Sequence, residues 1–194
     1  MSLKINNLTK VFDSKKLFNN FSYDFSDNGI YIVKGESGIG KTTLLRMICG
    51  LDNDYLGSID GGGIGRCGCA FQEYRLFPNF TALENVVFAN FDKNSKADFD
   101  RSEEMLLALG LKKEDFSLLP SALSGGMKHR VSLARAFVSK YPILLLDEPT
   151  KELDEENIKR VIDIISALAK EKLIIIVSHG DENYGAMATE LVIK

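Results

Sequence analysis

One short segment, residues 35–42, constrains the fold of this chain more than any other. It reads GESGIGKT and matches the phosphate-binding pattern G-x-x-x-x-G-K-[S/T]. The β-prone run 30–33 precedes it, and the helix-compatible stretch 42–49, which ends at Gly50, follows it. A strand, a glycine-rich turn and a helix in this order are the context that the pattern requires. The segment therefore predicts a phosphate loop in an α/β fold.

This loop predicts a set of phosphate contacts. Its glycines let successive backbone N–H groups point at one phosphate, and the helix that follows directs the positive end of its dipole at the same anion. Lys41 would reach the β- and γ-phosphates, and the Thr42 hydroxyl is an oxygen ligand of the kind that Mg²⁺ prefers, with Thr43 as a weaker second candidate. Glu36 is unfavourable near a triphosphate, so we expect its side chain in solvent. The expected nucleotide contacts of the loop are Gly35, Ser37, Gly38, Gly40, Lys41, Thr42 and Thr43.

A pair of acidic residues follows a second apolar run. Residues 143–146, ILLL, lack polar alternation, which is typical of a strand covered on both faces by helices. Asp147 and Glu148 come next, so two carboxylates stand at the carboxyl edge of a central strand, where ligand sites of α/β folds form. We interpret Asp147 as a magnesium ligand. Glu148 would orient and polarise a water for in-line attack on the γ-phosphorus.

The rest of the chain divides into strand and helix segments. The run 173–177 repeats the pattern of 143–146, and apolar residues at three-and-four spacing between them predict an amphipathic helix. Strands are also expected at 21–25 and 65–71, with an irregular glycine-rich loop from Gly50 through Gly63. A capping box at Thr81 and Glu84 predicts a helix over 82–91, and a second helix fits 96–109.

Composition bounds the size and class of the protein. The 194 residues suit a single domain, 1–194, and 45% hydrophobic residues suffice for a core. A formal net charge of -3 provides no broad attraction for nucleic acid, so no nucleic-acid partner is expected. The apolar runs are far shorter than a bilayer span, and the N-terminus lacks the apolar block of a secretion signal, which indicates a cytoplasmic location.

The cysteines Cys49, Cys67 and Cys69 are odd in number, and no two of them stand at the gap of a zinc or redox motif. We therefore expect reduced thiols. Cys67 and Cys69 could both contact a soft metal, but they stand in an alternating stretch before Phe71. Small apolar residues in a strand are the better interpretation.

A further motif narrows the assignment from superfamily to family. Residues 123–127, LSGGM, resemble the LSGGQ signature of ATP-binding cassette (ABC) ATPases. The order of the other motifs is similar to that family too: Phe71-Gln72 resembles its Q-loop, Asp147-Glu148 its second Walker motif, Leu153-Asp154 its D-loop and His179 its switch histidine. The resemblance spans residues 8 to about 193. Departures are Met127 for the signature glutamine, Lys151-Glu152 before the D-loop, and Gly180 after the histidine.

The resemblance implies a fold and a mechanism. The expected fold is an α/β phosphate-loop NTPase core with a mainly parallel central sheet, an N-terminal antiparallel β part and a helical subdomain over about 77–138. The catalytic residues implied are Lys41, Gln72, Glu148 and His179, with Thr42, Gln72 and Asp147 around Mg²⁺. Two copies would close head to tail on ATP, so that Ser124, Gly125 and Gly126, at the start of a helix over 126–138, meet the partner's γ-phosphate and Asp154 organises the facing subunit. Phe12 is the candidate for stacking on adenine, although a core position is an equal alternative for it and for Phe18 and Phe21.

The family resemblance also implies partners. The simplest role is the ATP-binding subunit of a transporter, a homodimer when ATP is bound, docked through Gln72 and the 77–120 region on a separate transmembrane permease at the inner face of the membrane. Within the family, the sequence looks most like the ATPase subunits of nitrate, sulfonate and taurine importers, on the basis of residues 71–78, 81–86 and Met127. That group implies a separate solute-binding protein. An exporter of lipoproteins or peptides shares every catalytic residue and stays an alternative.

Other functions of phosphate-loop proteins fit the sequence less well. ABC ATPases that act on DNA need long insertions between the two Walker motifs, and those that act on ribosomes usually fuse two cassettes. A GTPase needs an Asn-Lys-x-Asp base reader, which this sequence lacks, and a small-molecule kinase has no need of the signature segment.

Overall fold

The computed structural model describes residues 3–13, 15–25, 28–90, 95–178, 182–185 and 188–193. Within them the strands are β1 (Leu3–Phe12), β2 (Lys15–Phe25), β3 (Gly29–Lys34), β4 (Leu56–Asp60), β5 (Cys67–Ala70), β6 (Ile143–Asp147), β7 (Leu173–Val177) and β8 (Ala188–Val192). The helices are α1 (Lys41–Ile48), α2 (Ala82–Val87), α3 (Lys96–Ala108), α4 (Gly125–Phe137) and α5 (Glu155–Leu168), with short 3₁₀ helices at Phe88–Asn90, Lys113–Asp115 and Pro120–Ala122.

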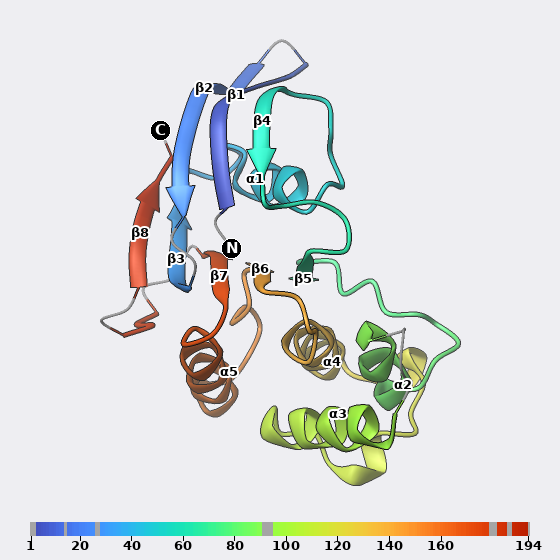
Figure 1. Cartoon of the computed structure of the whole chain (residues 1–194). Helices are drawn as coiled ribbons and strands as arrows, with labels where there is room; N and C mark the ends of the chain where they lie inside the picture. The colour runs from blue at the N-terminus through green and yellow to red at the C-terminus, as the bar shows by residue number, and fades with distance from the viewer. Residues whose placement is uncertain are drawn as a thin grey trace.

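A parallel sheet of five strands, in the order β5-β6-β7-β3-β8, forms the centre of the molecule (Figure 1). Its neighbouring strands are all parallel, and every residue of β6 and β7 is buried. This confirms the predicted α/β class and the predicted central strands. The continuous apolar runs have the composition that a strand needs when both of its faces are covered.

The two faces of this sheet carry two separate cores. Alternate residues of β6 and β7, such as Leu145 and Ile175, pack with α1 and with the antiparallel sheet. The residues between them, such as Leu144 and Ile174, pack with α4 and α5. Because side chains alternate across a strand, a single run of apolar residues supplies both cores. Figure 1 shows α1 on one side of the parallel sheet and α4 and α5 on the other.

The N-terminal β part is a three-stranded antiparallel sheet in the order β2-β1-β4. The predicted loop from Gly50 through Gly63 is wrong in part, because β4 occupies its middle and pairs with β1. Most side chains of β4 are exposed, so the segment has no apolar alternation to reveal it. The edge strand is held instead by backbone bonding and by Asn6, whose amide donates to Ser58 and Asp60.

The helical region lies between β5 and β6 in the chain. Its first helix, α2, begins with the predicted capping box of Thr81 and Glu84, but it ends at Val87 and a 3₁₀ turn follows, so it is shorter than predicted. Helix α3 begins at a second capping box, formed by Ser95 and Asp98. Helices α2 and α3 contact α4, and α4 contacts β5 (lower part of Figure 1).

The cysteines match the structural interpretation. Cys49 is buried at the end of α1, Cys67 and Cys69 are half-buried in β5, and all three are free thiols. In the part of the chain that the structure describes, no three histidine, cysteine, aspartate or glutamate side chains are placed to hold a metal ion. The described part of the chain also contains no helix with the length and apolar character needed to cross a bilayer.

Candidate nucleotide-binding site

A cavity of about 480 Å³ opens where the carboxyl ends of β6 and β7 meet the start of α1. The parallel register of β6, β7 and β3 brings these ends to one edge of the sheet, since Asp147 pairs with Val177 and Val177 with Val33. Residues from most of the predicted motifs line it: Phe12, Ser37, Gly38, Gly40, Lys41, Thr42, Thr43, Gln72, Asp147 and Glu148. Sequence reasoning missed four further lining residues: Lys15, Leu17, Arg46 and Val177.

The phosphate loop runs from the end of β3 to the start of α1. Gly40 is the N-cap of α1 in a left-handed conformation, with φ +111°, and a Cβ there would lie 3.1 Å from the ring of Phe18. Only glycine fits this position without strain. Among the described residues no side chain caps α1, which leaves its first N–H groups facing the cavity as anion donors. The Glu36 side chain is exposed, as its charge predicted.

Lys41 is a buried cation at the cavity wall. Its Nζ donates hydrogen bonds of 2.8 Å to the carbonyl oxygens of Gly35 and Glu36, within its own loop. Burial lowers the pKa of Lys41 from its ordinary value, and the carboxylates of Glu148 and Asp147 oppose that shift. The ammonium group is therefore held close to the phosphate loop by two carbonyls and two nearby carboxylates.

Thr42 and Asp147 join the two predicted motifs. The hydroxyl of Thr42 donates to Oδ2 of Asp147 over 2.8 Å, and Asp147 is buried. Gln72, an exposed residue after β5, lines the same cavity. Hydroxyl, carboxylate and amide oxygens are the hard ligands that Mg²⁺ takes when phosphates supply the rest of its shell, so these residues fit that ion. The Thr43 side chain also lines the cavity.

Glu148 has an unusual backbone. Its φ of +52° is left-handed, a conformation that costs a non-glycine residue roughly 1–2 kcal/mol. Its N–H donates to the Val177 carbonyl over 2.8 Å, and its carboxylate lies 3.7 Å from the ammonium of Lys151. Strain of this kind persists where neighbouring structure enforces it, often at functional sites. Here it accompanies a carboxylate that borders the cavity.

Phe12 ends β1 and borders the cavity with 62% of its surface exposed. The alternative of a core position is therefore wrong for Phe12. It holds for Phe18, which is buried, and Phe21 packs against that core. An exposed aromatic ring at the rim of a phosphate site has the geometry of a base platform.

The predicted signature and D-loop residues lie apart from this cavity. Ser124 is the N-cap of α4, and its hydroxyl accepts the N–H of Met127 over 3.2 Å, with Gly125 and Gly126 in the first turn. Asp154 is the N-cap of α5 and accepts the N–H of Asn157 over 2.9 Å. Hydrogen bonds from Asn157 hold the pKa of Asp154 below its ordinary value. His179 lies outside the described residues.

Two polar residues of α4 gave no sequence signal. His129 is buried in α4, its Nδ1 lies 3.0 Å from the Lys151 carbonyl, and its ring stacks on Tyr74. The guanidinium of Arg130 bonds to backbone carbonyls at the far end of α3. Both look like ordinary solvent-facing helix residues in the sequence, because their partners are distant along the chain.

Comparison with known proteins decides between the phosphate-loop families. The family model described as ABC transporter matches residues 18–151, more than half of the chain. The chain belongs to the ABC transporter family.

Two curated ABC relatives are 34% identical to this chain. One is the spermidine/putrescine import ATP-binding protein PotA of Marinobacter nauticus, with 98% of this chain and 54% of the relative aligned. The other is the arginine transport ATP-binding protein ArtM of Bacillus subtilis, with 91% of this chain and 80% of the relative aligned. The chain thus spans about half the length of the polyamine importer subunit and most of the arginine one.

A solved ABC structure shares the fold. The dimeric ATP-binding cassette MJ0796, in a post-hydrolysis state bound to ADP and Pi, aligns with a TM-score of 0.84 and 26% identity, covering 97% of this chain and 94% of that one. That cassette is dimeric, whereas the signature residues of this chain lie outside its own cavity.

Proposed function

We propose that this chain is the ATP-binding and hydrolysing subunit of an ABC transporter, and that it drives solute import through a separate membrane permease. The Thr42–Asp147 contact carries the proposal, because it joins a phosphate loop to an acidic strand end beside a cavity that Glu148 also borders. The family assignment, and relatives named as import and transport ATP-binding proteins, support the link to transport.

Nucleotide binding would use the phosphate loop and the rim of the cavity. The backbone N–H groups of Gly38, Gly40 and the first turn of α1 would hold the phosphates, and Lys41 would exchange its loop carbonyls for β- and γ-phosphate oxygens. Phe12 would stack on adenine. Each of these groups borders the cavity already, so binding needs little rearrangement beyond the Lys41 side chain.

Hydrolysis would depend on Glu148. Its carboxylate would accept a hydrogen bond from the attacking water and polarise it toward the γ-phosphorus, while Lys41 offsets charge on the phosphate oxygens. Thr42, Gln72 and Asp147 would hold Mg²⁺, which supplies charge neutralisation at the β- and γ-phosphates. His179, by its resemblance to the switch histidine, would contact the γ-phosphate.

A second copy of the chain would complete the site. Ser124, Gly125, Gly126 and Asp154 lie outside the cavity of their own subunit, so they can serve a nucleotide only across an interface. In a head-to-tail dimer, the start of α4 would direct N–H groups and the Ser124 hydroxyl at the partner's γ-phosphate. The dimeric cassette that aligns with this chain supports such pairing.

The transport partners are proposed on the same basis. A transmembrane permease would dock beside Gln72 and the 77–120 region, and the chain would then lie at the cytoplasmic face of the membrane. Motif resemblance favours nitrate, sulfonate or taurine as cargo, with a separate solute-binding protein. The relatives named above handle polyamines and arginine, so uptake assays with all five solutes would decide the class.

Nucleotide-dependent pairing tests the proposal directly. The Glu148→Gln variant would be measured by light scattering with and without Mg-ATP, and we expect the mass to double from 21.5 kDa only with the nucleotide. The same variant carrying Lys41→Ala is the control and should stay monomeric, because it binds ATP weakly. A constant mass in Glu148→Gln with ATP demonstrably bound would contradict the composite site.

A further inference from the structure

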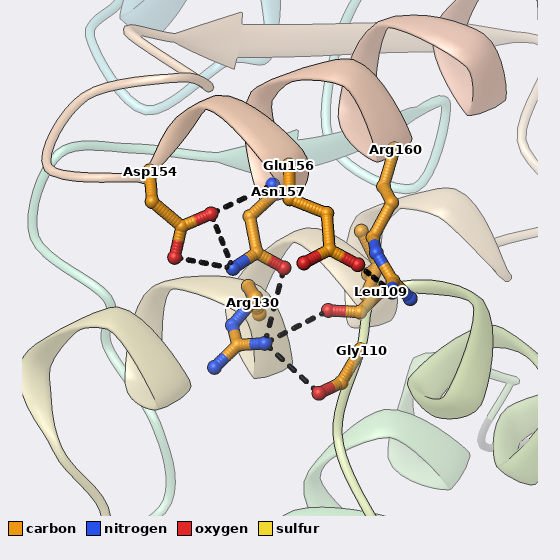
Figure 2. Close-up of polar contacts among 7 residues, drawn as sticks. All are labelled: Leu109, Gly110, Arg130, Asp154, Glu156, Asn157 and Arg160. Atoms are coloured by element: carbon orange, nitrogen blue, oxygen red, sulfur yellow. Dashed lines mark hydrogen bonds and ion pairs between the residues drawn. The ribbon is translucent and has the colours of Figure 1, made fainter.

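The side chain of Arg130, in the second turn of α4, connects the signature segment to the end of helix α3. Figure 2 shows its contacts with Leu109 and Gly110 at the end of α3. Its Nε donates to the Gly126 carbonyl over 3.3 Å, inside the signature segment. Its Nη1 donates to the carbonyls of Leu109 and Gly110 over 3.1 and 3.0 Å. These carbonyls belong to the terminus of α3, where backbone acceptors lack helical partners and a cation is favourable.

Asn157, in the first turn of α5, extends this network to the D-loop. Its Oδ1 accepts from Nη1 of Arg130 over 3.3 Å, and its Nδ2 donates to both carboxylate oxygens of Asp154, each over 2.9 Å (Figure 2). An amide offers an acceptor to the guanidinium and a donor to the carboxylate at once. An aspartate at position 157 would lack the donor, and a leucine would lack both the donor and the acceptor. Asparagine therefore suits this bridge.

The fit around the bridge is tight at Gly110. This glycine has φ +77°, and a Cβ there would lie 3.0 Å from Oδ1 of Asn157 and 3.1 Å from Nη1 of Arg130. The chain can therefore pass close enough for its carbonyl to reach Arg130 only with glycine at this position. Three segments that are far apart in sequence thus meet at one polar contact.

We infer that Asn157 is a positioning residue, which fixes the signature segment and Asp154 relative to each other so that one subunit presents both to the nucleotide of the other. The inference rests on the proposed composite site. Ser124–Gly126 begins α4 and Asp154 begins α5, so a misalignment between these helices would move one group away from the partner's phosphate while the other stays in place. The Arg130–Asn157–Asp154 path opposes that misalignment with charge-assisted hydrogen bonds.

The Asn157→Ala variant tests the inference without removing the helix cap. The N–H that caps α5 on Asp154 belongs to the backbone of residue 157 and survives the substitution. In the Glu148→Gln background, sedimentation with Mg-ATP should show a dimer weaker by roughly tenfold or more, because residue 157 then makes no side-chain hydrogen bond to Arg130 or Asp154. ATP affinity of the dilute monomer should be unchanged, because Asn157 is outside the cavity lining. In the background with Glu148 intact, kcat should fall while KM for ATP stays constant.

A matched control and a double variant complete the test. Lys159→Ala alters an exposed residue on the same helix and should leave dimer strength unchanged. Arg130→Lys should weaken the dimer, and adding Asn157→Ala to it should weaken it little further, because both act through one path. If the losses of dimer strength from Arg130→Lys and Asn157→Ala were additive, the inference would be wrong. It would also be wrong if Asn157→Ala left the dimer of the Glu148→Gln chain undiminished, and in both cases the composite site would still stand. Failure of Glu148→Gln itself to pair would overturn the composite site and the inference with it.

Discussion

The hydroxyl of Thr42 donates a 2.8 Å hydrogen bond to Oδ2 of Asp147, a residue 105 positions later in the chain. Thr42 is in the first turn of α1, and Asp147 is the last residue of β6. The parallel pairing of β6 with β7 and of β7 with β3 brings these two ends together. A hydroxyl oxygen and a carboxylate oxygen, both of the hard type that suits Mg²⁺, therefore lie side by side at the edge of the cavity.

This contact predicts which threonine serves the metal. Thr42→Ala should raise the Mg²⁺ concentration needed for half-maximal ATP hydrolysis by about 10–100-fold, whereas Thr42→Ser keeps the hydroxyl and should stay close to the unmodified chain. Thr43→Ala is the matched control, because Thr43 lines the cavity without a bond to Asp147. Mg²⁺ titrations of the ATPase rate measure both. A larger effect from Thr43→Ala would reassign the ligand.

Glu148 should separate turnover from binding. In Glu148→Gln the amide cannot polarise water as a carboxylate does, so kcat should fall by roughly 10²–10⁴-fold while Mg-ATP still binds. Phosphate release and equilibrium binding of ATP measure the two effects. Glu152→Gln, which changes an acid of the same loop near Tyr74, should keep the rate. Hydrolysis retained in Glu148→Gln would reject Glu148 as the group that polarises water.

Phe12 should contribute to ATP binding only through its contact with the adenine base. Stacking on a nucleobase contributes about 1–3 kcal/mol, so Phe12→Ala should weaken ATP binding by roughly 5–150-fold. Phe12→Tyr preserves a ring and should bind ATP nearly as well. Inorganic tripolyphosphate, which has no base, should bind the Phe12→Ala variant as it binds the unmodified chain. Equal losses for ATP and tripolyphosphate would place the role of Phe12 in the phosphate site.

The sequence was informative where one local pattern decides the structure. The apolar runs of β6 and β7 and the capping box at Thr81 are signals of this kind, and the structure confirms them. Strand β4 gave no signal, because it is a mostly exposed edge whose register depends on a partner some 50 residues earlier. Its Gly57, with φ +98° and no room for a Cβ beside Asn6, looks like a loop glycine in the sequence.

In the candidate site too, local sequence motifs predict some features and tertiary contacts set the others. The phosphate loop and the Asp147-Glu148 pair each form a motif that is read within a few residues, and both line the cavity. The left-handed backbone of Glu148 and the carbonyl partners of Lys41 depend on the folded structure around them, so no sequence pattern predicts them. The bridge from Arg130 in α4 to Asn157 in α5 spans 27 positions. Such a contact is visible only once the helices are packed.

The buried ring of His129 makes stability depend on pH. Burial lowers the pKa of His129 from its ordinary value of 6.5, although the Lys151 carbonyl and Glu152 oppose the shift. A folded-state pKa below the unfolded one means that the neutral ring's contribution is complete above the unfolded pKa and is lost as pH falls. The free energy of unfolding should therefore decrease from about pH 7 to about pH 5, with a slope from this group of at most about 1.4 kcal/mol per pH unit.

Replacement of the ring isolates this contribution. In His129→Gln no group at that position takes up a proton in this range, so urea unfolding from about pH 8 down to about pH 5 should give a shallower loss of stability than in the unmodified chain. At about pH 8 a histidine with an ordinary or lowered pKa is neutral. The difference in free energy of unfolding between the two chains at that pH therefore measures only the loss of packing on Tyr74 and of the contact with the Lys151 carbonyl. Parallel curves across the whole range would show that His129 binds protons equally in the folded and unfolded states, which its burial in α4 argues against.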